Sequence, residues 1–475
     1  MRKYTTALTA GLLLAAACKD NPVVPPVDAP TTNAVSGQLT SAGVKTLALG
    51  VLANDRNLVS ELSYSKLPEI YARDMYRIDP NEPRYVTETL AGTPDPGSFS
   101  GSGGWTNGYV TIRAANTLLA ALPNTPASQV SPAQLQATTG LIQTFKALEY
   151  YRLLELRDSL GVALQPDNDP NTVGPIVCKA KALDYIAALL DSANTALVAA
   201  GGASLPFTPP TGFTKYGRDY TKAANLALFN RGLKGKVDVY RGLQHQSPVA
   251  GAFTQAITEL STALGTATPG GVPSSDFKTG LYVTFVAGGT ENAANPLSDS
   301  RIGVNPKAQA GLQAGDTRAS KIIPLAKPIS GSGITTDVTF VGSDAGNAAN
   351  LTNPIAILRD EELVLLRAQA YFEAGQPLNG LADLNSVRTS YGLPALTLAD
   401  VPTLDAQRNA LLYEKRYSLF FEGPQRLVDL RAYGKLKAGV TTPEVASDPF
   451  NTAIPIPKTE ADARGGRENL TPSCS

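Results

Sequence analysis

Apolar residues recur at helical spacing along most of this chain, and segment 358–388 shows the pattern most clearly. Its first half places small and apolar side chains at every third or fourth position, and Gly375 stands where that run stops. Pro377 precedes a second periodic run. A small-residue helix, a glycine break and a second helix are typical of a tetratricopeptide repeat. The segment therefore predicts a helical hairpin.

The same spacing predicts helices elsewhere in the chain. Ser131 and Pro132 fit an N-cap followed by proline at the first helical position, so a long helix is expected over 133–158. The other expected helices comprise one or two from about Val44, one at 112–122, and a pair at 179–200 and 222–242. Residues 92–104 are rich in glycine, proline and serine and predict a loop.

Residues 245–355 interrupt the helical pattern. They are rich in Gly, Asn, Ser, Thr and Pro, with short β-like runs at 281–286 and 338–341. Loops of this size within a compact chain are usually functional or disordered. Because no linker separates the helical regions, we expect a mainly α fold. It would form one domain over residues 36–475, with tetratricopeptide-type helical pairs and long irregular loops.

The N-terminus has the features of an export signal. Arg2 and Lys3 precede a short apolar run over 7–17, and Cys18 follows small residues. This predicts a signal peptide over 1–17 and lipidation of Cys18. The proline-containing segment 18–35 would be a tether between lipid and folded body. The alternative is an ordinary signal peptide with an incidental cysteine.

Composition excludes several classes of function. The formal net charge is zero, and no basic run is long enough to follow a phosphate backbone, so nucleic acid is not expected as a partner. One histidine and three cysteines leave little material for a metal site or histidine catalysis, and no cofactor fingerprint is present. Cys178 and Cys474 remain available to pair in an exported chain.

Short motifs near the C-terminus carry a family resemblance. They are the Leu-Asn-Ser-Val-Arg run at 384–388, Glu-Lys-Arg at 414–416, Phe-Glu-Gly at 421–423 and Asp-Leu-Arg at 429–431. In this order they resemble the SusD/RagB family of outer-membrane nutrient-binding lipoproteins. Ser418 departs from the family by replacing an acidic residue. Pro424 is a second departure, and the spacing from Gly423 to Asp429 is one residue longer than usual.

This resemblance implies a location and a partner. It implies a SusD-like fold and a lipid-anchored protein on the outer membrane, facing the cell exterior. Its ligand would be a glycan or oligopeptide, passed to a TonB-dependent transporter of the SusC type. Two other classes remain open: a tetratricopeptide scaffold that binds only proteins, and a secreted glycosidase.

Clustered charges provide a test of the glycosidase alternative. Glu361 with Glu362, and Glu422 among nearby arginines, offer carboxylate pairs of the kind that glycosidases use. The opposite charges are interleaved, however, and nearby cations stabilise ionised carboxylates rather than raising one pKa for acid catalysis. We therefore interpret these clusters as ion pairs between helices and expect no catalytic residue.

Aromatic residues are the better candidates for ligand binding, and they concentrate between Tyr64 and Tyr109. Aromatic faces stack on sugar rings, and nearby polar groups orient hydroxyls. Tyr76 and Tyr85 stand beside turn residues, so we expect both to be exposed and to contact ligand. For Trp105 and Tyr109 we favour a place in the core.

Overall fold

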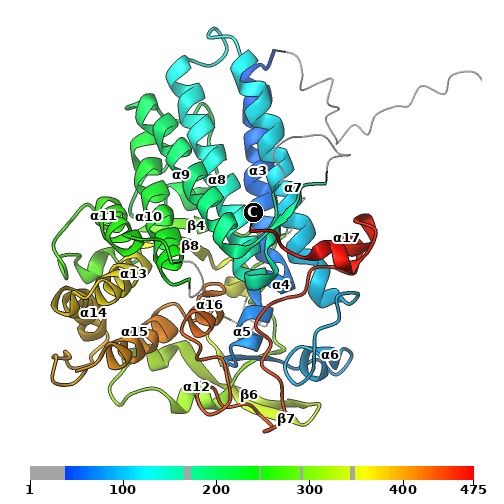
Figure 1. Ribbon diagram of the computed structural model, residues 1–475, viewed down its shortest axis with the longest axis vertical. Coiled ribbons are helices and arrows are strands. Elements are labelled where there is room, and N and C mark those ends of the chain that lie inside the picture. The colour runs from blue at the N-terminus through cyan, green and yellow to red at the C-terminus, as the bar shows by residue number, and fades with distance from the viewer. Residues whose placement is uncertain (1–37, 165–172, 245–247, 289–292, 343–347, 475) are drawn as a thin grey trace, which may run out of the picture.

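Five long helices lie side by side and form the upper part of the molecule (Figure 1). They are α3 (Ser41–Ser60), α7 (Phe99–Ala121), α8 (Pro132–Arg157), α9 (Lys179–Ala200) and α10 (Ala223–Gly242). The computed structural model describes residues 38–164, 173–244, 248–288, 293–342 and 348–474. The predicted signal peptide, Cys18 and the whole predicted tether lie outside these residues.

A second group of helices continues from α10. It comprises α11 (Ala252–Leu264), α13 (Asp360–Glu373), α14 (Pro377–Ser390), α15 (Leu404–Ser418) and α16 (Gln425–Ala432). Helix α10 packs on both α9 and α11, and α11 packs on α13, so the helical pairs form a continuous series. The shorter helices are α4 (Leu62–Ser65), α5 (Leu67–Tyr71), α6 (Arg84–Thr87), α12 (Pro306–Ala310) and α17 (Lys458–Ala463).

The predicted helix ends are confirmed to within one or two residues for α8, α9, α10 and the 358–388 hairpin. Ser131 accepts a hydrogen bond from the Gln134 backbone, and Gln134 bonds back to the Ser131 backbone, so a capping box begins α8. Gly375 has a φ of 71°, which allows the turn between α13 and α14. The mainly α prediction is therefore correct.

The predicted loop at 92–104 is partly wrong, because α7 already begins at Phe99. Its glycines allow close packing between helices. A Cβ on Gly104 would lie 2.5 Å from the Ser63 hydroxyl, and one on Gly108 would lie 2.9 Å from Leu153. Helix α11 and the long strand β6 were likewise missed within the loop-rich 245–355 segment.

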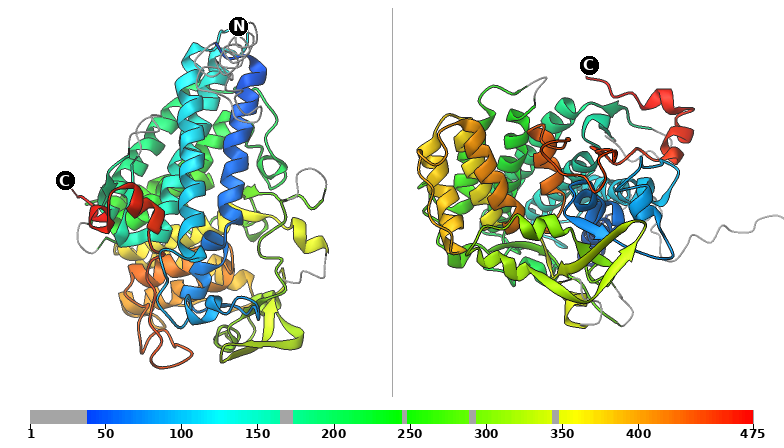
Figure 2. Two further views of the ribbon diagram at one scale, coloured as in Figure 1. Left: turned by 90° about the vertical axis from the view of Figure 1, so that its right-hand side faces the viewer. Right: turned by 90° about the horizontal axis from the view of Figure 1, so that it is seen from below.

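Within the described residues, the strands form four separate antiparallel pairs. These pairs are β1 (Met75–Arg77) with β5 (Ile302–Val304), β2 (Val162–Ala163) with β3 (Ile176–Val177), β4 (Gly280–Val283) with β8 (Ile355–Arg359), and β6 (Ile322–Gly331) with β7 (Ile334–Phe340). The expected β-like runs at 281–286 and 338–341 overlap β4 and β7. In the side view the β6–β7 hairpin lies below the upright long helices (Figure 2).

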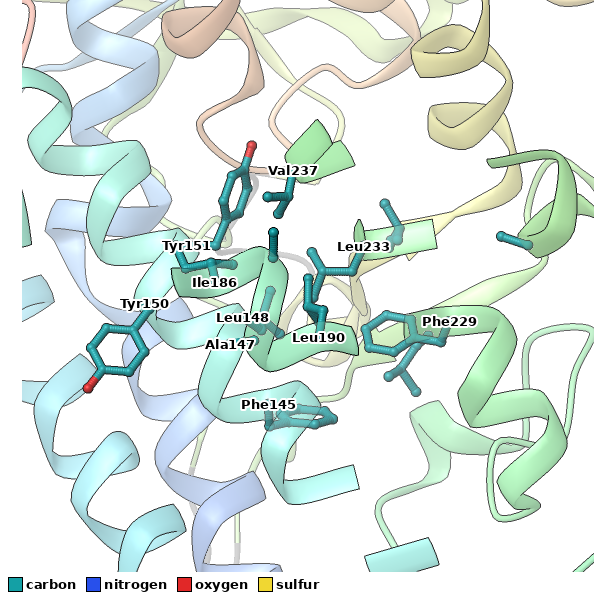
Figure 3. Packing of buried hydrophobic residues seen from close by; sticks show 14 of the residues in the cluster. Phe145, Ala147, Leu148, Tyr150, Tyr151, Ile186, Leu190, Phe229, Leu233 and Val237 are labelled. Atoms are coloured by element: carbon teal, nitrogen blue, oxygen red, sulfur yellow. The ribbon is translucent and has the colours of Figure 1, made fainter. Parts of the chain in front are cut away.

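Buried apolar side chains form two clusters. The larger one runs between the long helices, where Leu148, Leu190 and Leu233 come together from α8, α9 and α10 (Figure 3). The smaller one joins α5 and β1 to β5 and to Phe420. A disulfide between Cys178 and Cys474 attaches the C-terminal segment to the start of α9.

Candidate functional site

A cleft of about 770 Å³ opens where segments far apart in the sequence meet, and we call it the aromatic cleft. Ring side chains make up much of its lining. They are Tyr216, Phe277, Tyr282, Phe340, Tyr391, Phe420 and Phe421. The cleft draws on the loop before α10, on β4, β7 and β8, and on the turns that follow α14 and α15.

Strand β4 places Tyr282 at the cleft. Tyr282 pairs with Ala356 of β8, while the neighbouring Leu281 and Val283 point into the protein and are buried. The Tyr282 ring lies 4.1 Å from the ring of Tyr216, measured between centroids, and both are half-buried. The two rings therefore present a partly exposed aromatic surface on one side of the cleft.

The Phe-Glu-Gly turn provides another wall. Phe421 has a φ of 60°, in the left-handed region that costs a non-glycine residue about 1–2 kcal/mol. In this conformation its ring stacks on Phe420 at 4.2 Å and meets Phe340 edge-on at 5.1 Å. Surrounding packing holds the strained residue in place, and such strain is common at functional sites.

Arg359 binds both carboxylates of the cleft. Its guanidinium donates to both oxygens of Glu422, at 2.7 and 2.9 Å, and to Glu361. Burial alone would raise the pKa of Glu361, but the charges of Arg359 and Lys321 outweigh burial and lower it. Arg359 and Lys321 thus favour the ionised form of Glu361, which does not suit a general acid.

Lys321 occupies the floor of the same cleft. Its ammonium donates to the carbonyl oxygens of Tyr417 and Ser418, at 2.8 and 2.6 Å. Burial lowers its pKa to about 8, with Glu422 opposing that effect. The cleft thus combines ring faces with polar groups that are already fixed by protein partners. This arrangement suits reversible binding of a polar ligand with flat apolar faces.

The structure contradicts the expected exposure of Tyr76. Its side chain is only 4% exposed, because β1 pairs with β5 and Tyr76 belongs to the smaller buried cluster. The Tyr76 hydroxyl donates to a Glu444 oxygen at 2.9 Å. Tyr76 does not line the aromatic cleft, and its assignment as a ligand contact is an untested prediction.

Tyr85 is half-buried in α6, and the Arg77 guanidinium lies 3.7 Å from its ring centroid. One face of this ring is therefore occupied, and a ligand role for Tyr85 also stays a prediction. Trp105 is 4% exposed and packs 4.9 Å from Tyr109, so the preferred core interpretation of this pair is confirmed. Lipidation of Cys18 concerns residues outside those described.

The ion-pair interpretation of the charged clusters is confirmed. Glu362 pairs with Lys236 at 3.0 Å, and Asp429 pairs with Lys415 at 2.7 Å. Glu414 lies between two arginines on other segments. These contacts join α10, α13, α14, α15 and α16, so the charges hold the helices in register.

Two kinds of feature are absent from the described ranges. No group of three or more His, Cys, Asp or Glu side chains converges there in a way that would hold a metal ion. No helix in the same ranges combines the length and apolar character needed to cross a bilayer.

Comparison with known proteins gives a consistent result. A model of the SusD family matches residues 331–463. A SusD superfamily structure from Bacteroides thetaiotaomicron superposes with a TM-score of 0.65 at 16% identity, covering 90% of this chain and 98% of that one. A SusD superfamily protein from Bacteroides vulgatus gives 0.65 at 17%, covering 89% and 97%.

A structure described as a laminarin-binding SusD-like protein gives a TM-score of 0.60 at 18% identity, covering 88% of this chain and 97% of that one. Another, described as a SusD-like carbohydrate-binding protein from Bacteroides vulgatus, gives 0.60 at 12%, covering 92% and 99%. No curated protein matches the sequence.

Proposed function

Since this chain is a member of the SusD/RagB family, we propose that it is a lipid-anchored outer-membrane protein that binds a glycan without altering it. The observation that carries the proposal is the aromatic cleft, whose carboxylates Glu361 and Glu422 are both held by Arg359. Ring faces supply affinity for sugars, and a carboxylate that pairs with an arginine is poorly suited to donate a proton as a general acid.

Two neighbours support a glycan over an oligopeptide. One is described as laminarin-binding and the other as carbohydrate-binding, and each superposes on nearly nine-tenths or more of this chain. Residues 36–475 would form the binding domain. The proposed anchor is a lipid on Cys18, and the proposed recipient of the glycan is a TonB-dependent transporter of the SusC type at the cell surface.

Titration calorimetry tests the binding step. Laminarin, starch, xylan and mannan oligosaccharides would be titrated into the mature protein. We expect at least one to bind, and Tyr282→Ala and Tyr216→Ala to weaken that binding by roughly two- to tenfold, since each stacked ring contributes about 0.5–1.5 kcal/mol. The thermal melt should change little because both rings are half-buried at the surface.

Tyr85→Ala tests the alternative site, because Tyr85 is a predicted ligand contact outside the aromatic cleft. If it abolishes binding while Tyr282→Ala does not, the ligand site lies in the Tyr64–Tyr109 stretch instead. If no oligosaccharide binds but a peptide library does, the scaffold alternative is favoured. Turnover of any glycan, lost on Glu422→Gln, would favour the glycosidase.

Purification from the native outer membrane tests the partner. The protein should be recovered with a large β-barrel receptor under gentle detergent, through an interface above about 1,000 Å² in total. Repeated recovery as a lone monomer would count against a transporter partner.

A further inference from the structure

A second pocket, of about 320 Å³, lies apart from the aromatic cleft, and we call it the basic pocket. It is formed where α5 ends, at the start of α12, along α15 and α16, and by the following segment at 435–442. Five cationic side chains line it: Arg73, Lys307, Arg416, Arg426 and Lys435. None of its lining residues carries a carboxylate.

The carboxylates behind this wall do not neutralise it evenly. Asp74 accepts two hydrogen bonds from Arg416, one of them at 3.0 Å from Nε. The same carboxylate lies 3.8 Å from Arg426 Nε, which is too long for a hydrogen bond. Burial and the charge of Asp74 raise the pKa of Glu69, while Arg426 and Arg416 oppose that effect.

Arg73 pairs with Glu444 and Asp448, and Lys435 pairs with Asp405. Since Arg416 pairs with Asp74, Arg426 and Lys307 are the pocket cations with the least compensation. Arg426 Nε is buried and has no hydrogen-bond partner in the described parts of the chain. The ammonium of Lys307 donates to a neutral group, the Pro443 carbonyl, at 2.9 Å. No described carboxylate forms a hydrogen bond with Arg426, so an anion in the pocket would provide the charged partner that this side chain lacks.

The rest of the lining indicates what carries the anion. Leu412, Leu430 and Val440 provide apolar surface, while Asn409 and Thr442 provide exposed amide and hydroxyl groups. A bare ion would make no use of these residues. A sugar ring with an acidic substituent would contact the apolar side chains and hydrogen-bond to the amide and hydroxyl groups. Its carboxylate or sulfate would bind the guanidinium of the arginine.

We propose that the basic pocket binds the carboxylate or sulfate group of an acidic saccharide. Arg426 and Lys307 hold the anion, and the leucine and valine side chains contact the ring. The choice of a saccharide as carrier rests on the proposed function, whereas the anion site itself does not.

Calorimetry at low salt tests the proposal with four probes: tetragalacturonate, its methyl ester, a chondroitin sulfate tetrasaccharide and sodium sulfate. We expect at least one acidic oligosaccharide to bind, and the ester to bind at least tenfold more weakly than tetragalacturonate if that is the ligand. Arg426→Gln and Lys307→Gln should each lower the affinity at least fivefold and reduce its dependence on salt. Lys458→Gln is the matched control, since Lys458 is 63% exposed on α17 and pairs with Asp462.

Several results would overturn the proposal. They are equal binding of ester and acid, no binding of either acidic oligosaccharide, or unchanged affinity in the two pocket variants. Binding of free sulfate alone would assign the pocket to an inorganic ion and overturn the saccharide part. Lys307 is exposed, so its variant keeps the test valid even where Arg426→Gln fails to fold. Tyr282→Ala separates the two sites, because it should spare acidic-ligand binding whether or not a neutral glycan binds the aromatic cleft.

Discussion

Arg318 and Glu414 form an ion pair at 2.7 Å in which neither side chain is exposed to solvent. Arg318 also bonds Asp316 and the hydroxyl of Ser418, and Glu414 also accepts from Arg388 at 2.8 Å. Ser418 replaces the acidic residue expected from the family resemblance, and here its hydroxyl accepts from the arginine. The pair therefore joins the segment after α12 to α14 and α15.

Glu414→Gln should destabilise the protein by about 3–5 kcal/mol, because it leaves Arg318 and Arg388 buried without their shared carboxylate. Urea unfolding measures this loss as a lower midpoint with an unchanged slope. Asp405→Asn is the control: Asp405 also pairs with a lysine, but it is 67% exposed and should change stability by less than about 1 kcal/mol. Equal effects of the two substitutions would show that burial of the pair is unimportant.

Gly140→Ala should destabilise the α8–α9 pair by about 1–3 kcal/mol through overpacking. An added Cβ would lie 2.4 Å from the Leu197 side chain and 2.9 Å from the Ala193 carbonyl. Gly50 in α3 has nothing within 4 Å of the same position, so Gly50→Ala should raise stability by about 0.5–1 kcal/mol. Thermal melts of the two variants should move in opposite directions, and a shared direction would contradict this packing.

Asp360 should make stability depend on pH. Burial raises its pKa from 3.8 to about 7, opposed by Arg218 and assisted by Asp276. Between about pH 4 and 7 the Asp360 carboxyl holds a proton in the folded state and releases it in the unfolded state. Its contribution to the stability of the folded state is therefore complete below about pH 4 and is lost as pH rises to about 7. The Asp360→Asn side chain cannot ionise. As pH rises across this window, the free energy of unfolding of the variant should therefore increase relative to that of the parent protein, by up to a few kcal/mol.

Urea unfolding of both proteins at pH 4.5, 6.0 and 7.5 measures the Asp360 effect as a difference, which cancels the other titrating groups. Asp462→Asn serves as the control because Asp462 is exposed. Its free energy of unfolding should change with pH in the same way as that of the parent protein. Parallel curves for Asp360→Asn would contradict a raised pKa at this position.

The proposed anchor predicts that the mature chain begins at Cys18 and carries acyl groups there. Mass spectrometry of the N-terminal peptide would detect the acylation directly. Cys18→Ala should release the protein from membranes, since the acyl chains supply the membrane affinity through burial of their methylenes. An unmodified N-terminus, or cleavage at another position, would rule this anchor out.

Local signals in the sequence were sufficient for most helices. The Ser131 cap and the Gly375 break are short-range features, and both mark real helix ends. Helix α11 was missed because its surroundings are rich in residues that favour loops, although its own apolar residues are well placed for a helix. The strand period could have revealed Tyr282, which alternates with buried Leu281 and Val283.

The cleft itself depends on contacts that local patterns do not encode. Tyr216 and Tyr282 are in contact although they are 66 positions apart in the sequence (282 minus 216). Arg359 and Glu422 are in contact at a sequence separation of 63. Tyr76 stands beside turn residues that suggest exposure. Its strand nevertheless pairs with the distant strand β5, and its hydroxyl donates to the distant Glu444. Turn-forming residues predict where the chain bends, but they do not show which distant segments pack against that bend.

The disulfide between Cys178 and Cys474 has a consequence for proteolysis. The bridge spans a sequence separation of 296 residues, so every loop between α9 and α17 lies inside one covalent ring. A single cut in any of those loops opens the ring but leaves both pieces joined through sulfur. A nicked molecule would keep its full mass on a non-reducing gel and separate into two fragments only after reduction, so a single proteolytic cut would not by itself release either half.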